Sequence, residues 1–254
     1  RQMNEFGLND TPIIMAGGVW YLREFESWFS DPDVGPVSFQ FGTRPLLTQE
    51  SPISTEWKQR LLSLKKGDVS LHRHSPTGFY SSAVRNDFIK ELDSRSLRQI
   101  AFTTEPVGEH TAAFSVGARK KPVFVAPADK VRAQEWMCEG FVEPMRTPDQ
   151  TLMFVSLEKR NEIHQDQVDC MGCLSACLFS NWSDNAQGNT TSKKPDPRSF
   201  CIQKTLQDIS HEGNLENNLM FAGHGAYRFA QDPFYGNGFI PTVKQLVDRI
   251  ATGD

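Results

Sequence analysis

Two short apolar stretches near the start of the chain each end in a glycine turn, and together they restrict the fold more than any other feature. Residues 11–29 read TPIIMAGGVWYLREFESWF, which is a β-prone apolar run, the turn Gly17-Gly18 and then apolar residues at helical spacing. Residues 36–43, PVSFQFGT, alternate apolar and polar side chains as a strand does and end in a turn at Gly42. A strand, a helix and a second strand in so short a stretch predict a right-handed parallel crossover and an α/β fold.

The rest of the chain adds further strands and helices. Beyond residue 97 the apolar runs QIAFTTE, AAFSV, PVFVA and TLMFVSL predict strands, and residues 130–138 and 157–165 predict helices. Ser54 is placed to cap a helix, because it directly precedes an apolar pattern with helical spacing. Residues 181–199 are polar and rich in Asn, Ser and Pro, which is typical of a loop, and residues 240–250 predict a closing helix.

These patterns divide the chain into four parts. Residues 1–95 hold the two strand–helix units and the helices that follow, and residues 96–168 form an α+β extension. Residues 169–217 carry a cysteine cluster and the polar loop. Residues 218–254 form a closing segment that we expect to pack back on the first part.

The two glycine turns predict a site for an anion. Main-chain N–H groups at a turn between a strand and a helix point towards one spot, and the helix dipole favours negative charge there. In (β/α)8 barrels the turns after the last two strands commonly bind a phosphate. A single Gly-Gly turn is more often a matter of backbone geometry, but two turns about one strand–helix unit apart favour a site. We expect it to be formed by Ala16, Gly17, Gly18, Gly42 and Thr43, with the Thr43 hydroxyl as an additional donor.

The balance of charge argues against large polyanionic partners. The chain has 27 Lys and Arg against 31 Asp and Glu, a net charge of -4, whereas nucleic acids and anionic membranes are usually met by clustered cations. No apolar run of about 18 residues and no secretory signal is visible. We therefore expect a cytoplasmic protein whose partner is a small-molecule substrate, with no nucleic acid and no membrane.

Three of the five cysteines fall within the sequence DCMGCLSACLFSNW, at Cys170, Cys173 and Cys177, and Cys201 follows the polar loop. Two thiolates at this spacing can chelate metal through a tight turn, and two further thiolates complete a four-sulfur shell. Three interpretations stay open: a [4Fe–4S] cluster, a structural zinc ion, or reduced cysteines packed as small apolar residues. The fifth, Cys138, lies in an apolar helix and is expected in the core.

Four stretches carry a resemblance to a known family. The sequences PIIMAGG, VSFQFGTRPLLTQE, SPTGFYSSAVRNDFI and MFAGHGAYRF…IPTVKQLVDRI resemble the C-terminal part of the nitronate monooxygenase (2-nitropropane dioxygenase) family, over residues 5–90 and 218–252. The resemblance implies the last two βα units of an FMN-binding (β/α)8 TIM barrel. It also implies that Gly17, Gly18, Gly42 and Thr43 contact the FMN phosphate, with Ala16 flanking them.

The resemblance further implies an FMN-dependent oxidoreductase whose flavin takes electrons from a small organic substrate or from NAD(P)H. The family's catalytic histidine precedes the penultimate barrel strand, and no histidine precedes Ile13 here. We therefore assign no catalytic residue to this chain and expect it to be a fragment that is inactive alone. The cysteine run is similar to that of iron–sulfur relatives of old yellow enzyme, although the fourth cysteine comes sooner there.

Two other functions remain open. One is a metal-stabilised interaction module on a barrel that no longer binds flavin, and the other is a phosphate-binding barrel lyase or isomerase without flavin. His72 and His74 alternate as strand residues do and are candidates for a metal, but we expect them at an exposed, polar strand end.

Overall fold

The computed structural model describes residues 5–8, 10–116, 120–184, 186–191, 193–211 and 213–252. The chain forms two compact units, which are described separately. Unit 1 combines residues 1–71, 82–86 and 208–254, and unit 2 combines residues 72–81 and 87–207. Unit 1 thus brings the closing segment to the first part of the chain, while the cysteine-rich segment lies in unit 2.

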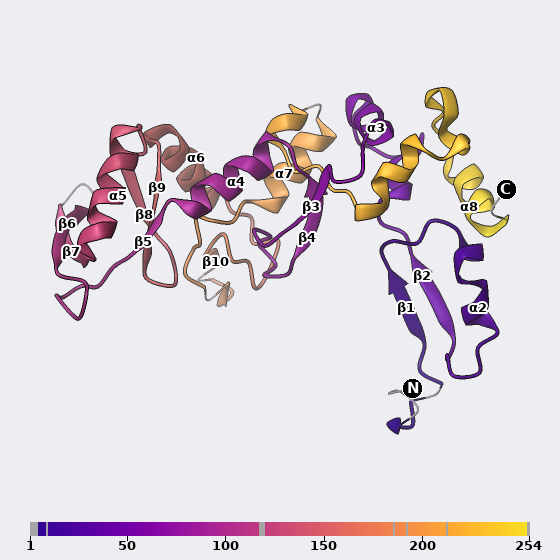
Figure 1. Cartoon of the computed structure of the whole chain (residues 1–254), viewed down its shortest axis with the longest axis horizontal. Helices are drawn as coiled ribbons and strands as arrows, with labels where there is room; N and C mark the ends of the chain where they lie inside the picture. Colours follow the sequence, from indigo (N-terminus) through magenta and orange to yellow (C-terminus); the bar gives the residue numbers. More distant parts are fainter. Residues whose placement is uncertain are drawn as a thin grey trace. The chain divides into compact units, whose positions relative to one another are not determined.

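The predicted parallel crossover is present in unit 1. Strand β1 (Ile13–Ala16) pairs in parallel with β2 (Val37–Gln40), and the chain between them forms the 3-10 turn η1 (Leu22–Phe25) and the short helix α2 (Glu26–Phe29) (Figure 1). The register sets Ala16 opposite Gln40, so the two strands end side by side. Both glycine turns therefore leave the same end of this small sheet.

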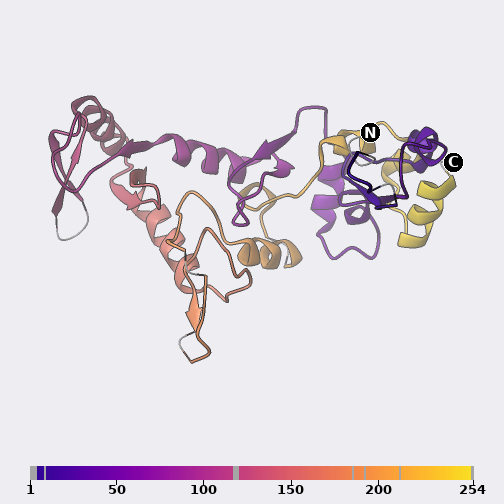
Figure 2. The same cartoon turned by 90° about the horizontal axis from the view of Figure 1, so that it is seen from below.

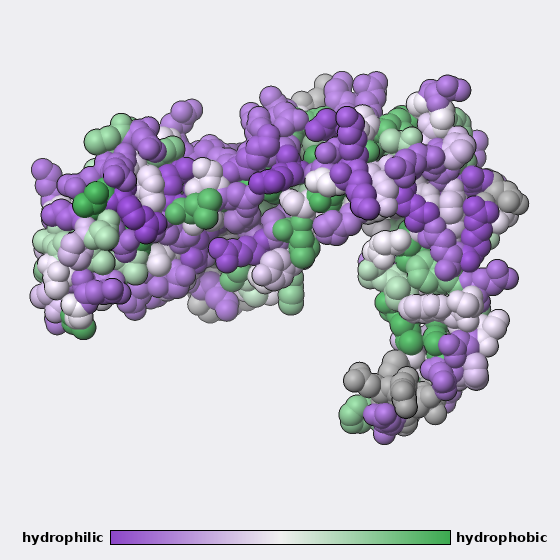
Figure 3. Space-filling model, in the orientation of Figure 1, coloured by the Kyte–Doolittle hydropathy of each residue, from purple (hydrophilic) through white to green (hydrophobic). Residues whose placement is uncertain are grey.

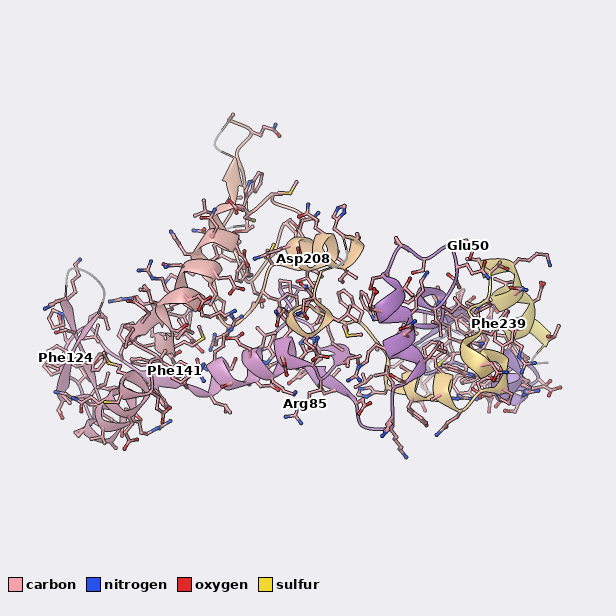
Figure 4. The ribbon with its side chains drawn as sticks, turned by 90° about the horizontal axis from the view of Figure 1, so that it is seen from above. Glu50, Arg85, Phe124, Phe141, Asp208 and Phe239 are labelled. Carbon is pink, nitrogen blue, oxygen red and sulfur yellow. The ribbon has the colours of Figure 1, made fainter. Side chains whose placement is uncertain are left out.

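The core of unit 1 joins segments that are distant in the sequence. Helix α3 (Thr55–Leu62) packs against the 3-10 segments η4 (His224–Ala230) and η5 (Pro233–Gly238). Helix α8 (Val243–Thr252) contacts η1 and also η2 (Arg44–Leu46). It is the yellow helix at the C-terminal end of the chain in Figures 1 and 2. At the start of α8 both carboxylate oxygens of Glu50 accept the Val243 N–H, at 3.1 and 2.9 Å; Figure 4 labels Glu50. The remaining elements of this part are β3 (Val69–His72), β4 (Ser81–Val84) and η3 (Leu215–Asn217).

Unit 2 is an α+β region built on an antiparallel sheet in the order β5 (Gln99–Ala101), β9 (Thr151–Val155), β8 (Glu143–Arg146). A second antiparallel pair is formed by β6 (Ala112–Val116) and β7 (Lys121–Val125). The guanidinium carbon of Arg98 lies 3.7 Å from the centre of the Phe141 ring, which packs against the hydrophobic core of unit 2. Figure 4 labels Phe141 and Phe124, which lie in this unit. The helices are α4 (Asp87–Leu97), α5 (Pro127–Cys138), α6 (Leu157–Val168) and α7 (Ile202–Ser210), whose last three residues belong to unit 1.

The elements of the two units match the sequence predictions in part. The α/β class is confirmed, and the strands and helices predicted between residues 99 and 168 are present, whereas β8 was not predicted. Within the described residues the sheets have two or three strands and do not close, so a partial barrel stays a prediction. The polar loop contains two two-residue strands, β10 (Ser183–Asp184) and β11 (Asn189–Thr190), while residues 185 and 192 lie outside the description. No helix in the described part of the chain is long and apolar enough to cross a membrane.

Candidate functional site

The turn after β1 has a backbone that only glycine adopts easily. Gly17 and Gly18 have φ values of 84° and 75°, in the left-handed region that disfavours other residues. A Cβ atom added at either position, or at Gly42 after β2, would meet nothing within 4 Å. These positions therefore border open space and are not packed against protein.

That open space is a pocket of about 430 Å3, which is within the size range of small-molecule sites. All five residues predicted from the glycine turns line it: Ala16, Gly17, Gly18, Gly42 and Thr43. A third wall comes from the closing segment, through Phe221, Ala222 and Gly223 among others. The structure thus brings the two turns together, as the parallel register requires, and whether they bind FMN stays a prediction.

The two turns carry main-chain N–H groups on residues that line this pocket. Outside the strand ladder, no backbone hydrogen bond among the described residues has the N–H of Gly17, Gly18, Gly42 or Thr43 as its donor. The Thr43 hydroxyl oxygen accepts the Gly223 N–H at 2.7 Å, and a Cβ at Gly223 would lie 3.1 Å from that oxygen. Because the hydroxyl is an acceptor in this bond, its own proton remains available for another hydrogen bond.

Arg44 is a lining residue that the sequence analysis missed. Its side chain is only 2 % exposed, and it donates to the Trp20 carbonyl and, at 3.2 Å, to the Tyr235 hydroxyl. The guanidinium lies 4.7 Å from the centre of the Trp20 ring and 5.0 Å from that of Tyr21, which are distances of cation–π contact. Its Nη2 atom is buried and has no partner in the described part of the chain.

Asp232 fixes the aromatic residues around Arg44. Its carboxylate accepts the Trp20 indole N–H at 2.7 Å and the Tyr21 hydroxyl. Burial opposes ionisation of this carboxyl, but these hydrogen bonds outweigh that cost and lower the pKa of Asp232 below its ordinary value. No local sequence signal marks either role, because the contacts join positions about 190 to 210 residues apart.

The four predicted metal ligands also share one pocket, in unit 2. Cys170, Cys173, Cys177 and Cys201 all line a space of about 280 Å3, and all four are free thiols. Burial raises the pKa of the Cys173 thiol, and the neighbouring cysteines raise it further. Over the described residues, no three or more His, Cys, Asp or Glu side chains are grouped closely enough to hold one metal ion, so the binding of zinc or of an iron–sulfur cluster stays a prediction.

Two expectations about single residues were wrong. Cys138, expected in the core, is exposed at the end of α5. His72 and His74, expected at an exposed strand end, are both buried, and their rings stack at 5.9 Å. The alternation of polar residues in this stretch does not reveal that Phe200, far along the chain, covers the His72 ring.

Comparison with known protein families gives a match that covers nearly the entire chain. A family model described as nitronate monooxygenase matches residues 7–253, including both glycine turns and the whole of unit 2. No curated protein and no solved structure matches the chain.

Proposed function

Because the chain belongs to the nitronate monooxygenase family, we propose that it forms the phosphate-binding end of an FMN-dependent oxidoreductase. Enzymes of this family are flavin-dependent oxidoreductases that act on small molecules. When bound, FMN supplies the transfer of electrons from a small organic substrate or from NAD(P)H. The observation that carries the proposal is the convergence of the two glycine turns on one pocket.

In this proposal the chain holds the phosphate mainly through its backbone. The N–H groups of Gly17, Gly18, Gly42 and Thr43 donate to the phosphate oxygens, and the Thr43 hydroxyl adds one further donor. The glycines matter because side chains at these positions would occupy the open space that the phosphate needs. Among the lining residues that the structure describes, Arg44 is the only cation, and its charge favours a dianion nearby.

We also propose that β1 and β2 are the last two strands of a (β/α)8 barrel. Within the described residues β1 and β2 pair only with each other, so they form a sheet of two strands. Parallel sheets are normally larger and are covered on both faces. Figure 3 shows hydrophobic side chains gathered over this pair, where Ile14 is 65 % exposed. Other strands of the barrel would cover this surface and supply the catalytic base, so this chain is expected to be inactive alone.

The phosphate site can be tested by comparing FMN with riboflavin, which lacks the phosphate. We expect the chain to bind FMN at least about 10-fold more tightly in a fluorescence titration, since one charge-assisted contact contributes about 1.4 kcal/mol or more. Gly18→Ala should remove most of this preference. Equal affinity of the wild-type chain for the two ligands would contradict the proposal.

A matched control separates binding from backbone strain. Gly67 also has a positive φ, 101°, and belongs to unit 1, but it does not line the pocket. Gly67→Ala should therefore destabilise unit 1 about as much as Gly18→Ala while keeping the preference for FMN. If both variants lose that preference equally, the glycine turn after β1 does not bind the phosphate.

A further inference from the structure

The cysteine pocket of unit 2 is built from two segments that the fold brings together. Cys170, Cys173 and Cys177 follow helix α6, and Cys201 directly precedes helix α7, beyond the polar loop. Twenty-four positions separate Cys177 from Cys201, so their meeting is a result of tertiary structure and not of local spacing. Other walls of the pocket are apolar, with Leu174, Phe179 and Ile202 among the lining residues.

The turn that carries the first two cysteines is constrained. Gly172, between Cys170 and Cys173, has a φ of 68°. A Cβ atom at Gly172 would lie 2.7 Å from the Trp182 ring, closer than real Cβ contacts, so the indole packs directly on the turn. Both observations require glycine here, and they hold the two thiols in a fixed arrangement beside the pocket.

Cys201 directly precedes the nine-residue helix α7, and its sulfur accepts hydrogen bonds from the main-chain N–H groups of Lys204 and Gln203. Burial raises the pKa of this thiol, and the two hydrogen bonds only partly oppose that effect. The Lys204 ammonium also lines the pocket and pairs with Asp166 at 2.8 Å. This wall of the pocket thus brings main-chain donors and one paired cation to Cys201.

The four cysteines that line this half-buried space are all free, so none of them is held in a disulfide. A single ion does not fit either, since no three ligand side chains of the described residues are grouped around one point. An iron–sulfur cube binds each thiolate through a different iron atom, so its ligands are spread around a larger volume.

We propose that this pocket binds a [4Fe–4S] cluster through Cys170, Cys173, Cys177 and Cys201. Binding is a ligand exchange without change of oxidation state: each cysteine loses its proton to solvent as its sulfur replaces an external thiolate on one iron. The site lies within unit 2 and is independent of the phosphate site of unit 1.

The test uses the whole chain and a preformed, small-thiolate-ligated [4Fe–4S] cluster as the probe, under argon. After desalting, we expect about four iron atoms and about four acid-labile sulfides per chain, with a broad absorbance near roughly 400 nm. Cys173→Ser and Cys201→Ser should each lower the bound iron several-fold. Cys138→Ser is the matched control, because Cys138 is a free, exposed cysteine of the same unit, and it should keep the full iron content.

Alkylation of the loaded wild-type chain tests the ligands without any variant that could misfold. Iodoacetamide followed by peptide mass spectrometry should modify Cys138 and spare Cys170, Cys173, Cys177 and Cys201. Equal modification of all five cysteines would overturn the proposal. So would iron content that is the same in Cys138→Ser and Cys201→Ser, or uptake of zinc at these thiols by a chain that retains no sulfide.

Discussion

At the scale of single residues, Arg44 is a buried cation of unit 1 that is stabilised by contacts with aromatic rings and with one main-chain carbonyl. Arg44→Lys retains the charge but loses the planar group that stacks on Trp20 and Tyr21 and donates to Tyr235. We expect the free energy of unfolding of unit 1 to fall by about 2 kcal/mol in urea titrations.

Arg23 provides a control for this change. Its guanidinium also stacks on Tyr21, at 4.9 Å, but the residue is exposed. Arg23→Lys should change the unfolding free energy by less than about 0.5 kcal/mol. Equal effects of the two substitutions would mean that burial and the extra contacts of Arg44 contribute nothing.

A pair of glycines in unit 2 separates backbone strain from side-chain collision. Gly172 and Gly188 have nearly the same φ, 68° and 70°, but a Cβ atom would collide with Trp182 only at Gly172. We expect Gly188→Ala to cost about 1 kcal/mol and Gly172→Ala at least about 1 kcal/mol more, measured by chemical denaturation. A smaller loss for Gly172→Ala would show that Trp182 moves away freely.

Burial of His72 makes the stability of unit 2 depend on pH. Burial, and then the nearby charge of His74, lower the pKa of His72 from 6.5 to about 4, against the opposing influence of Asp93. Between these values the unfolded chain binds a proton that the folded chain does not, so stability falls as the pH falls from about 6.5 to 4. At about 1.4 kcal/mol per pKa unit, we expect this group to account for a loss of about 3 kcal/mol.

His72→Leu removes the ionisable ring and should flatten this part of the pH profile in denaturation experiments between pH 7 and about 4.5. His164→Gln, which replaces an exposed histidine of the same unit, serves as the control and should leave the profile unchanged. A profile that is as steep in His72→Leu as in the wild type would assign the acid sensitivity to other groups.

At the scale of elements, the beginning of helix α3 tests how local signals stabilise unit 1. The Ser54 hydroxyl accepts the Trp57 N–H at 3.2 Å, as the sequence predicted for a capping residue. Ser54→Ala should cost about 1 kcal/mol of unfolding free energy, because one N–H at the helix start loses its acceptor. Ser63→Ala, at the other end of α3, removes only an exposed bond to the Arg60 carbonyl and should cost less than about 0.5 kcal/mol.

The sequence predicted those elements whose signals are local. Helix α3 has its capping serine, β1 and β2 have short apolar patterns, and their glycine turns mark the residues that meet at the pocket. Strand β8, with the sequence EPMR, has no such pattern and contains a proline. It is a strand because it lies at the edge of the sheet and pairs with β9, which is information from distant sequence.

The residues of the candidate sites also differ in whether local sequence signals could predict them. The turn residues and the clustered cysteines could be named from their spacing, because spacing alone limits what short loops can bind. The burial of Arg44 and of His72 could not be predicted from local spacing. Each of these residues contacts an aromatic ring more than a hundred positions away, Tyr235 for Arg44 and Phe200 for His72. The identity of a polar residue does not indicate which distant side chains will bury it.

At the scale of the whole molecule, the distribution of the cores decides which segments respond together to a substitution. Leu61 is fully buried in a core of unit 1 that includes Ala226 and Phe229, whereas Leu152 is fully buried in a core of unit 2 that includes Phe114 and Val123. Each leucine truncation should cost about 2 to 5 kcal/mol, since it leaves a cavity that closes only partly.

Hydrogen exchange read by mass spectrometry then tests whether unit 1, built from distant parts of the chain, behaves as one body. Leu61→Ala should speed exchange in residues 224–230, more than 160 positions along the sequence, because this segment packs on α3. It should leave residues 151–155 unchanged, and Leu152→Ala should give the reverse pattern. If Leu61→Ala speeds exchange in 151–155 as much as in 224–230, the two cores open together, and the division of the chain into separate units is wrong.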